Sequence, residues 1–228
     1  MRPAPAPRLA AEVVGTMLLV FFGAGAASHA ESSLIGVALA YAFALTLAVW
    51  VLGAVSGAHV NPAVTIALAL RRRISWPDVP LYIVAQLVGG IAAALLLWAV
   101  YGRHGIDAGL GATHVHRDVT VLGALVAEIV GAFLLVSAVY VLTVRERVPA
   151  GVAALGIGVA LGAATLAVGP ASGASLNFAR TFGPELVVAI GGGPAEWSNI
   201  WIYAVGPVIG GALAVFAHDF LVKQPTDS

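Results

Sequence analysis

Two stretches of the sequence share one frame, V-S-G-A-H-V-N-P-A-V at residues 55–64 and A-S-G-A-S-L-N-F-A-R at residues 171–180. Both contain S-G-A-x-x-N-x-A. Their asparagines, Asn61 and Asn177, are 116 positions apart, since 177 − 61 = 116. A frame of five shared residues is long enough to suggest that one half of the chain copies the other.

Two acidic residues repeat at the same spacing. Glu12 in A-E-V-V-G and Glu128 in A-E-I-V-G are also 116 positions apart, since 128 − 12 = 116. Two landmarks at one spacing indicate an internal duplication, with repeats at about 9–101 and 121–222. Each half holds three apolar runs, an odd number, so the second copy should be inserted upside down. In such inverted repeats, binding or conduction sites lie near the membrane midplane.

The composition places most of the chain in lipid. Of 228 residues, 60% are hydrophobic and 10% are charged, with a mean hydropathy of +0.98, whereas about a quarter of residues are charged in soluble domains. The 11 basic and 11 acidic residues balance, which excludes a basic nucleic-acid surface. The absence of cysteine excludes disulfides and thiolate chemistry. We predict a single transmembrane domain over residues 1–228 whose apolar runs lie at 9–28, 34–54, 79–101, 121–142, 151–168 and 199–222.

Two further apolar segments are too short to cross a membrane: Asn61 to Leu70, and Asn177 to about Ile190. A ten-residue helix is about 15 Å long, half of a hydrocarbon core of about 30 Å. Asparagine is a favoured N-cap and proline suits the first helical position, so Asn61 followed by Pro62 indicates a helix start. The fold class we predict is an all-α membrane protein with six transmembrane helices plus two re-entrant half-helices. The S-G-A-x-x segments then lie at a depth where non-helical backbone must line a water-filled cavity or be buried, which favours a pore.

Basic residues predict the orientation, because cationic loops resist translocation. If the N-terminus is cytoplasmic, the other face carries only Arg103 and Arg117. The cytoplasmic face then carries eight basic residues: Arg2, Arg8, Arg71, Arg72, Arg73, Arg145, Arg147 and Lys223. We predict a multi-pass protein of the cell membrane with both termini in the cytoplasm.

These residues together resemble the aquaporin, or major intrinsic protein, family. The resemblance covers essentially the whole chain, and its segments are the paired A-E-x-x-G starts, S-G-A-H-V-N-P-A-V-T at 56–65, A-Q-L-V-G-G at 85–90, N-x-A-R at 177–180 and V-G-P-V-I-G-G-A at 205–212. It implies a channel for water and small neutral solutes, assembled as a homotetramer with one pore per subunit and no cofactor.

The resemblance also implies which residues line the pore. The two motifs are Asn61, Pro62 and Ala63, and Asn177, Phe178 and Ala179. The asparagine amides would donate to a single file of water at the positive ends of two half-helices, which disfavours cations and hydronium. Backbone carbonyls would form one wall, and they belong to Gly57, Ala58 and His59 and to Gly173, Ala174 and Ser175.

The narrowest point of family members, counted from the asparagines, falls on Tyr41, Thr165, Ala174 and Arg180. Arg180 would be a fixed cation that donates to solutes and repels cations. Thr165 stands where water-strict members usually have histidine, and Ala174 is small, so we expect a wider, less polar filter. The filter lacks the second aromatic ring of glycerol-conducting members, and Thr181 stands where glycerol facilitators typically carry aspartate.

Phe178 departs from the family pattern, which has proline there. One interpretation is a packing variant of an unchanged pore. The other is a displaced Asn177 with altered permeation or proton exclusion. Proline at the first helical turn gives up an N–H that would be unpaired anyway, so phenylalanine restores a donor and adds a large ring near the other half-helix.

Other polar residues have two interpretations each. Glu12 and Glu128 could carry protons in a coupled transporter, but the resemblance implies that they accept hydrogen bonds from backbone donors of the re-entrant loops. His104, His114 and His116, with Asp107 and Asp118, could bind a metal or sense pH, although a solvated loop fits them better and we predict no metal site. His59 either faces the pore mouth or packs as a neutral, hydrogen-bonded side chain.

Three function classes follow from these patterns. A passive channel for water, and for solutes such as glycerol, urea or ammonia, explains the duplication, the half-helices and the shortage of ionisable groups in the spans. A glycerol facilitator with secondary water flux is the alternative within that class. A coupled transporter needs titratable groups at the midplane, where this sequence has asparagine. An enzyme needs a nucleophile with a base, or a metal cluster, and no motif for either is present.

Overall fold

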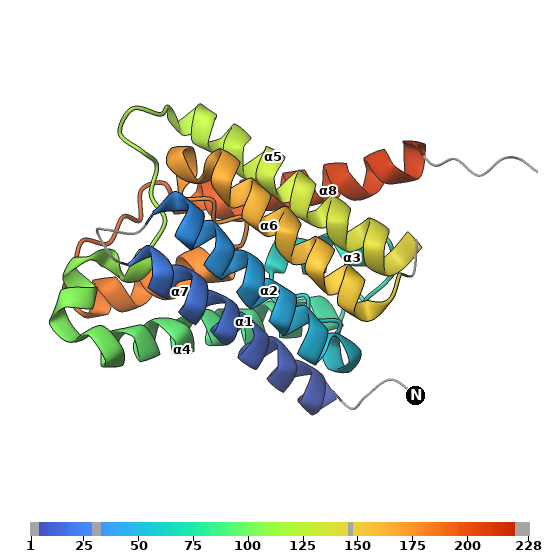
Figure 1. The fold of residues 1–228 in the computed structure, drawn as a ribbon, viewed down its shortest axis with the longest axis horizontal. Coiled ribbons are helices and arrows are strands. Elements are labelled where there is room, and N and C mark those ends of the chain that lie inside the picture. The colour runs from blue at the N-terminus through green and yellow to red at the C-terminus, as the bar shows by residue number, and fades with distance from the viewer. Residues whose placement is uncertain (1–4, 29–32, 146–147, 222–228) are drawn as a thin grey trace, which may run out of the picture.

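The computed structural model describes residues 5–28, 33–145 and 148–221, and the regular structure of this part of the chain is helical throughout (Figure 1). Six helices are long and apolar enough to cross a membrane, as predicted. They are α1 (Pro5–Ala27), α2 (Leu34–Ser56), α4 (Asp78–Asp107), α5 (Val121–Val139) with its continuation, α6 (Ala150–Ser172) and α8 (Ile200–Leu221). The shorter elements are α3 (Pro62–Leu70), the 3-10 turn η1 (Gly109–Gly111), the π-helical turn η2 (Tyr140–Arg145) that continues α5, and α7 (Phe178–Ile190).

The predicted spans agree with the helices, but several helix ends differ. Helix α4 continues six residues past the predicted end at 101, across Gly102, whose φ of 58° breaks the helical geometry. Helix α6 continues past 168 to Ser172 although it contains Pro170. The predicted span 121–142 ends inside η2. Arg2, Arg147 and Lys223, on which the predicted orientation also rests, lie outside the described residues.

The helices pack as two similar halves. Helix α1 packs on α2 and α4, and its counterpart α5 packs on α6 and α8, while α2 and α6 join the halves. The short helix α3 packs on α8 of the other half, and α7 packs on α4. Figure 1 shows α3 and α7 extending toward opposite ends of the molecule. This is the arrangement expected for inverted repeats with two half-helices that meet in the middle.

Glycines allow close helix crossings in both halves. A Cβ atom on Gly89 would lie 2.4 Å from the carbonyl oxygen of Val13, across the α1–α4 contact. A Cβ atom on Gly210 would lie 2.2 Å from the carbonyl oxygen of Ile129, across the α5–α8 contact. Helix association in a membrane depends on such close backbone approach, because lipid supplies no hydrophobic driving force between helices.

The outer surface of the bundle carries the apolar side chains that a lipid contact requires. Exposed large side chains occur on every span, and they include Phe22, Phe43, Val84, Val130, Val159 and Phe216. Helix α1 begins, and helix α8 ends, at the same end of the molecule (Figure 1). The chain is therefore a multi-pass membrane protein with an even number of crossings.

Candidate functional site

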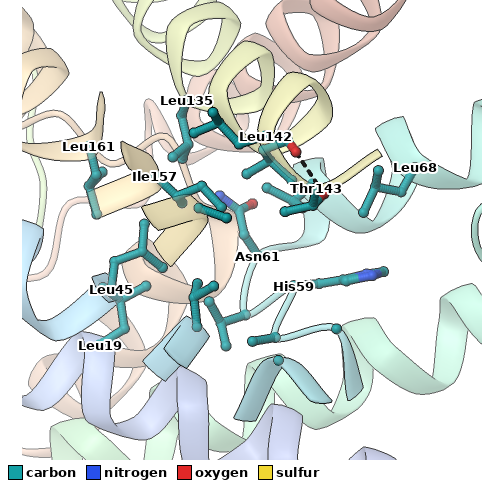
Figure 2. Close-up of a pocket in the computed structure, with 18 of the residues that line it drawn as sticks. Leu19, Leu45, His59, Asn61, Leu68, Leu135, Leu142, Thr143, Ile157 and Leu161 are labelled. Carbon is teal, nitrogen blue, oxygen red and sulfur yellow. Dashed lines mark hydrogen bonds between the residues drawn. The ribbon is translucent and has the colours of Figure 1, made fainter. Parts of the chain in front are cut away.

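Two cavities of about 560 Å³ each open along the bundle and share one lining residue, Arg180. We call them the inner cavity, which extends from Arg180 past Asn61 to Arg73, and the outer cavity, which extends from Arg180 to Glu196. Figure 2 shows Asn61 at the inner cavity among apolar side chains that include Leu45, Leu135 and Ile157. The two cavities together run along most of the bundle and meet at the predicted filter arginine.

The two motif asparagines meet in the inner cavity. Asn61 Nδ2 donates to the carbonyl oxygen of Leu176 at 2.8 Å, and Asn177 Nδ2 donates to the carbonyl oxygen of Val60 at 2.8 Å. Each side chain thus bonds to the residue that precedes the other asparagine. An amide nitrogen carries two hydrogens, so one N–H of each remains after this bond. Both residues line the inner cavity.

The same side chains begin the two half-helices. Asn61 Oδ1 accepts from the backbone N–H of Ala63 at 2.9 Å, and Asn177 Oδ1 accepts from the N–H of Ala179 at 3.0 Å. Both asparagines have extended φ and ψ angles, as N-caps do. The positive ends of α3 and α7 therefore meet at the asparagine pair, because a helix carries about half a positive charge at its N-terminus.

Two buried carboxylates hold the backbone that leads into these caps. Glu12 Oε1 accepts from Ser56 Oγ and from the N–H of His59, and its Oε2 accepts from the N–H of Val60 at 2.7 Å. Glu128 makes the matching bonds 116 positions later, to Ser172 Oγ and to the N–H groups of Ser175 and Leu176. The re-entrant segments thereby satisfy backbone donors that no water in a bilayer core could satisfy.

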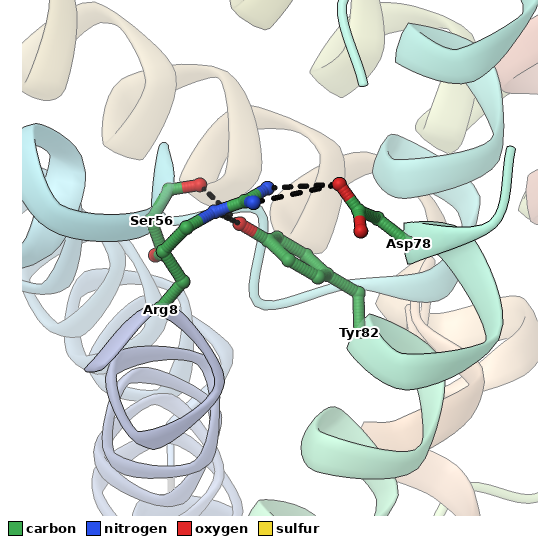
Figure 3. A network of polar contacts seen from close by, with 4 residues as sticks. All are labelled: Arg8, Ser56, Asp78 and Tyr82. Atoms are coloured by element: carbon green, nitrogen blue, oxygen red, sulfur yellow. Dashed lines mark hydrogen bonds and ion pairs between the residues drawn. The ribbon is translucent and has the colours of Figure 1, made fainter. Parts of the chain in front are cut away.

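A tyrosine hydroxyl caps the end of the long helix before each re-entrant segment. Tyr82 Oη donates to the carbonyl oxygen of Ser56 at 2.8 Å, and Tyr203 Oη donates to that of Ser172 at 2.9 Å. In the first half, Arg8 donates to Tyr82 Oη and pairs with Asp78, as Figure 3 shows. These tyrosines are 121 positions apart, since 203 − 82 = 121, so the sequence offset of 116 could not identify them as a pair.

The backbone of the re-entrant segments is non-helical in both halves. Gly57 and Gly173 follow α2 and α6 with φ angles of 92° and 78°. Positive φ angles recur at Ala58 and Val60 and, in the second half, at Ala174 and Leu176. Such angles are uncommon for residues with a side chain and persist only where surrounding contacts impose them. Of the predicted carbonyl wall, Gly57, Ala58, His59 and Ser175 line the inner cavity and Gly173 lines the outer cavity.

Three of the four predicted filter residues line the cavities. Arg180 lines both cavities, Tyr41 lines the inner one and Thr165 lines the outer one. The guanidinium carbon of Arg180 is 5.2 Å from the centre of the Tyr41 ring. Ala174 differs, because it is buried and lines neither cavity, although both of its sequence neighbours do. The Ala174 side chain is therefore not part of the wall of either cavity, in contrast to the prediction.

Phe178 points away from both cavities. Its ring packs on Phe182 at a centroid distance of 5.7 Å, and Phe182 packs on Trp197 at 6.1 Å. Phe178 lines neither cavity, and Asn177 keeps the same bonds as Asn61. Of the two interpretations of this substitution, the geometry agrees with the packing variant. Asn177 is not displaced relative to the arrangement of Asn61.

Sequence reasoning missed the loop that holds Arg180. The carbonyl oxygen of Gly111 accepts from Arg180 Nη1 at 2.7 Å. Two residues later, Thr113 Oγ1 lies 2.7 Å from Thr181 Oγ1, which lies 2.6 Å from Ser175 Oγ. This hydroxyl chain ends on Asn177, whose carbonyl oxygen accepts from Ser175 Oγ at 2.8 Å. No local pattern in the sequence marked Gly111 or Thr113.

Two other buried polar residues were also missed. Gln86 Nε2 donates to Glu12 Oε2 at 2.8 Å and to Thr65 Oγ1 at 2.9 Å, so this glutamine ties α4 to the first re-entrant segment. Gln86 lies in A-Q-L-V-G-G, one of the segments that carry the family resemblance, and this was the signal that could have identified it. Glu185 in α7 is 2% exposed, lines the outer cavity and accepts from the N–H of Glu196. Glu12 and Glu128 are therefore not the only deeply buried carboxylates.

The structure separates the histidines that the sequence grouped. His114 lines the outer cavity, while His116 Nδ1 lies 3.6 Å from a carboxylate oxygen of Asp118 on the surface. His59 combines both of its predicted interpretations, because it lines the inner cavity and its Nδ1 lies 3.1 Å from Thr65 Oγ1. Within residues 5–28, 33–145 and 148–221, no three histidine or acidic side chains cluster closely enough for a metal ion.

Comparison with known proteins agrees with this geometry. The family model described as "Major intrinsic protein" matches residues 4–218. Aquaporin AqpM of Methanothermobacter thermautotrophicus is 36% identical, over 95% of this chain and 98% of that protein. Probable aquaporin TIP2-2 of Arabidopsis thaliana is 40% identical, over 95% of this chain and 90% of that protein.

A solved structure has the same fold. The aquaglyceroporin from Plasmodium falciparum superimposes with a TM-score of 0.83, covering 96% of this chain and 97% of that chain. The two sequences are 22% identical, so the likeness concerns the fold alone. The chain belongs to the major intrinsic protein family.

Proposed function

We propose that this protein is a passive channel that conducts water and small uncharged solutes and excludes ions and protons. One observation carries the proposal: the crossed amide bonds of Asn61 and Asn177 where the two half-helices meet, on the wall of the inner cavity. A side chain fixed by two bonds keeps its remaining N–H in one direction. Water that passes there must present its oxygen to both amides, which interrupts a proton-conducting chain of water.

Electrostatics support the exclusion of cations. The positive ends of α3 and α7 converge on the asparagine pair, and Arg180 adds a fixed charge where the cavities meet. The inner cavity is otherwise walled mainly by apolar side chains such as Leu45 and Leu135. Such a wall holds water weakly, which favours fast passage. A gradient-coupled transporter would need a titratable group at the asparagine pair instead.

The filter residues support a solute range beyond water. Thr165 is smaller than histidine, and the Ala174 side chain lines neither cavity. Among the described residues, the aromatic ring beside Arg180 is that of Tyr41. Small solutes such as urea, ammonia or glycerol are candidates. Because none of the described residues places a second aromatic side chain there to hold a carbon chain, we place glycerol below water in the expected order of permeability.

Location and assembly belong to the same proposal. We infer a cell-membrane protein with one channel domain over residues 1–228, both termini in the cytoplasm, a homotetrameric assembly and no enzymatic activity. Helix α1 begins and helix α8 ends at the same end of the molecule, which supports both termini lying on one side of the membrane. The basic triplet Arg71 to Arg73, after α3, supports a cytoplasmic placement of that end.

Stopped-flow light scattering on proteoliposomes tests the conduction. A sucrose gradient should shrink protein-containing vesicles much faster than empty ones, with a low activation energy for water flow. A glycerol gradient should give equal shrinkage followed by slower re-swelling. Rapid re-swelling would favour the glycerol facilitator, and shrinkage no faster than in empty liposomes would contradict the proposal.

A further inference from the structure

The inner cavity has the size and the lining of a small-molecule pocket, in addition to forming part of the proposed channel. Its volume of about 560 Å³ lies within the range of about 300–1,000 Å³ that small-molecule pockets occupy. Toward the end at Arg73, the apolar lining includes Val49, Trp50, Leu68, Val139, Leu142 and Val144. A pocket with such a lining and few polar groups selects ligands with an apolar body and one well-placed charge or hydrogen-bonding group.

The cation Arg73 lines the inner cavity at the end opposite to Arg180. Arg73 follows α3, is exposed and lines the cavity, and its side chain makes no hydrogen bond or ion pair within the described part of the chain. Two other arginines at this end are already paired, since Arg71 pairs with Asp219 and Arg8 pairs with Asp78. Arg73 is therefore a cation beside an apolar cavity, and no carboxylate of the described residues pairs with it.

The charges of the two cavities are opposite. Among the described residues that line the inner cavity, none is a carboxylate, and the charged ones are Arg73 and Arg180. The outer cavity is lined by three carboxylates, those of Asp107, Glu185 and Glu196, together with Arg180. An anion is therefore attracted to the inner cavity and repelled from the outer one.

We propose that the inner cavity binds an amphiphilic anion, a short alkyl or aryl chain with one negative headgroup, and that this ligand closes the channel from that side. The headgroup pairs with Arg73 and the chain lies between Trp50 and Leu142, along the path to Asn61. The closing of the channel rests on the proposed function. The binding does not, because it needs only the cavity and the charge of Arg73.

Calorimetric titration of the protein in lipid nanodiscs tests the binding. Octanesulfonate is the probe, because it keeps its charge at all working pH values. Methanesulfonate supplies the charge without the chain, and octyltrimethylammonium supplies the chain with the opposite charge. We expect saturable binding of octanesulfonate alone. Equal binding of octyltrimethylammonium, or none by octanesulfonate beyond that of empty nanodiscs, would overturn the proposal.

A pair of neighbouring arginines provides the matched variants. Arg73→Gln should weaken octanesulfonate binding about tenfold, the order expected on loss of one charge-assisted hydrogen bond. Arg72→Gln should leave it unchanged, because Arg72 is also exposed but does not line the cavity. An equal loss in both variants would mean a diffuse charge effect and would overturn the assignment to Arg73.

Sided addition to proteoliposomes tests the closing. In vesicles of one orientation, octanesulfonate should slow water flux from the side of Arg73 and not from the side of Glu196. If octanesulfonate binds but does not slow water flux, the proposed closing of the channel is overturned and the proposed binding is kept. If the protein conducts no water, the proposed function fails, and the titration still decides whether the cavity binds the anion.

Discussion

Asn61 and Asn177 exchange hydrogen bonds between the two halves of the chain, each donating its amide to the carbonyl that precedes the other, at 2.8 Å in both directions. Each amide oxygen is meanwhile held by the first turn of its own half-helix. The orientation of both side chains is therefore fixed by atoms from both halves of the chain. Neither half-helix could shift without breaking a bond that the other half supplies.

Replacing Arg180 should weaken the exclusion of cations. Arg180→Val removes the fixed charge at the junction of the two cavities and widens the passage. We expect water flux to persist and proton or sodium leak to rise, with the protein still folded, because the asparagine pair does not depend on the guanidinium. A pH-sensitive dye inside proteoliposomes measures the leak.

Arg117 provides the control for this experiment. Its side chain is 88% exposed and lines neither cavity. Arg117→Gln should leave proton leak and water flux at the level of the original protein. An unchanged leak in the Arg180 variant would mean that the filter lies elsewhere.

Restoring proline at position 178 should change conduction little. Position 178 is the first residue of α7, where the fixed φ of proline is favourable and the lost N–H has no helical partner. The phenyl ring also points away from both cavities. We expect Phe178→Pro to keep water flux within a few-fold of the original, measured by stopped-flow light scattering. A large change in flux with the fold intact would indicate that Phe178 shapes the pore after all.

The two buried carboxylates should each be necessary for stability. In Glu12→Gln or Glu128→Gln, the amide nitrogen would replace an oxygen that accepts only from N–H or O–H donors. A donor facing a donor leaves buried groups unpaired, which costs about 1–3 kcal/mol for each. Thermal unfolding in detergent should show a lower midpoint for both variants.

The comparison between these two variants carries further information. Glu12 also accepts from Gln86, and no matching side-chain bond to Glu128 is among those observed for the described residues. We therefore expect the Glu12 variant to be the less stable of the two. An unchanged midpoint in both would contradict a scaffold role and revive the idea that these groups carry protons.

A methyl group at the α5–α8 crossing should destabilise the bundle. The Cβ atom of Gly210→Ala would lie 2.2 Å from a backbone carbonyl oxygen, so the helices must separate. Overpacking of this kind costs about 1–3 kcal/mol. Gly53→Ala is the control, because a Cβ atom there meets nothing within 4 Å. Equal midpoints for the two variants would show that the crossing can relax.

Most of the fold could be predicted from the sequence because its signals are local. Apolar runs of sufficient length define the six spans, and an asparagine before a short apolar run defines each half-helix. Helix ends were less predictable. Pro170 lies inside α6 rather than after it, and Gly102 interrupts α4 without ending it, since packing against neighbours can stabilise turns that local preference disfavours.

The sequence by itself determined the duplication, the positions of Asn61 and Asn177 and the presence of one arginine, Arg180, after the second motif. Only the tertiary structure decided that Gly111 holds this arginine and that Phe178 points outward. The reason is the range of the contacts. Periodicity and capping act within a few residues, whereas the bond from Asn61 to Leu176 joins residues 115 positions apart, so its partner exists only after the two halves have packed.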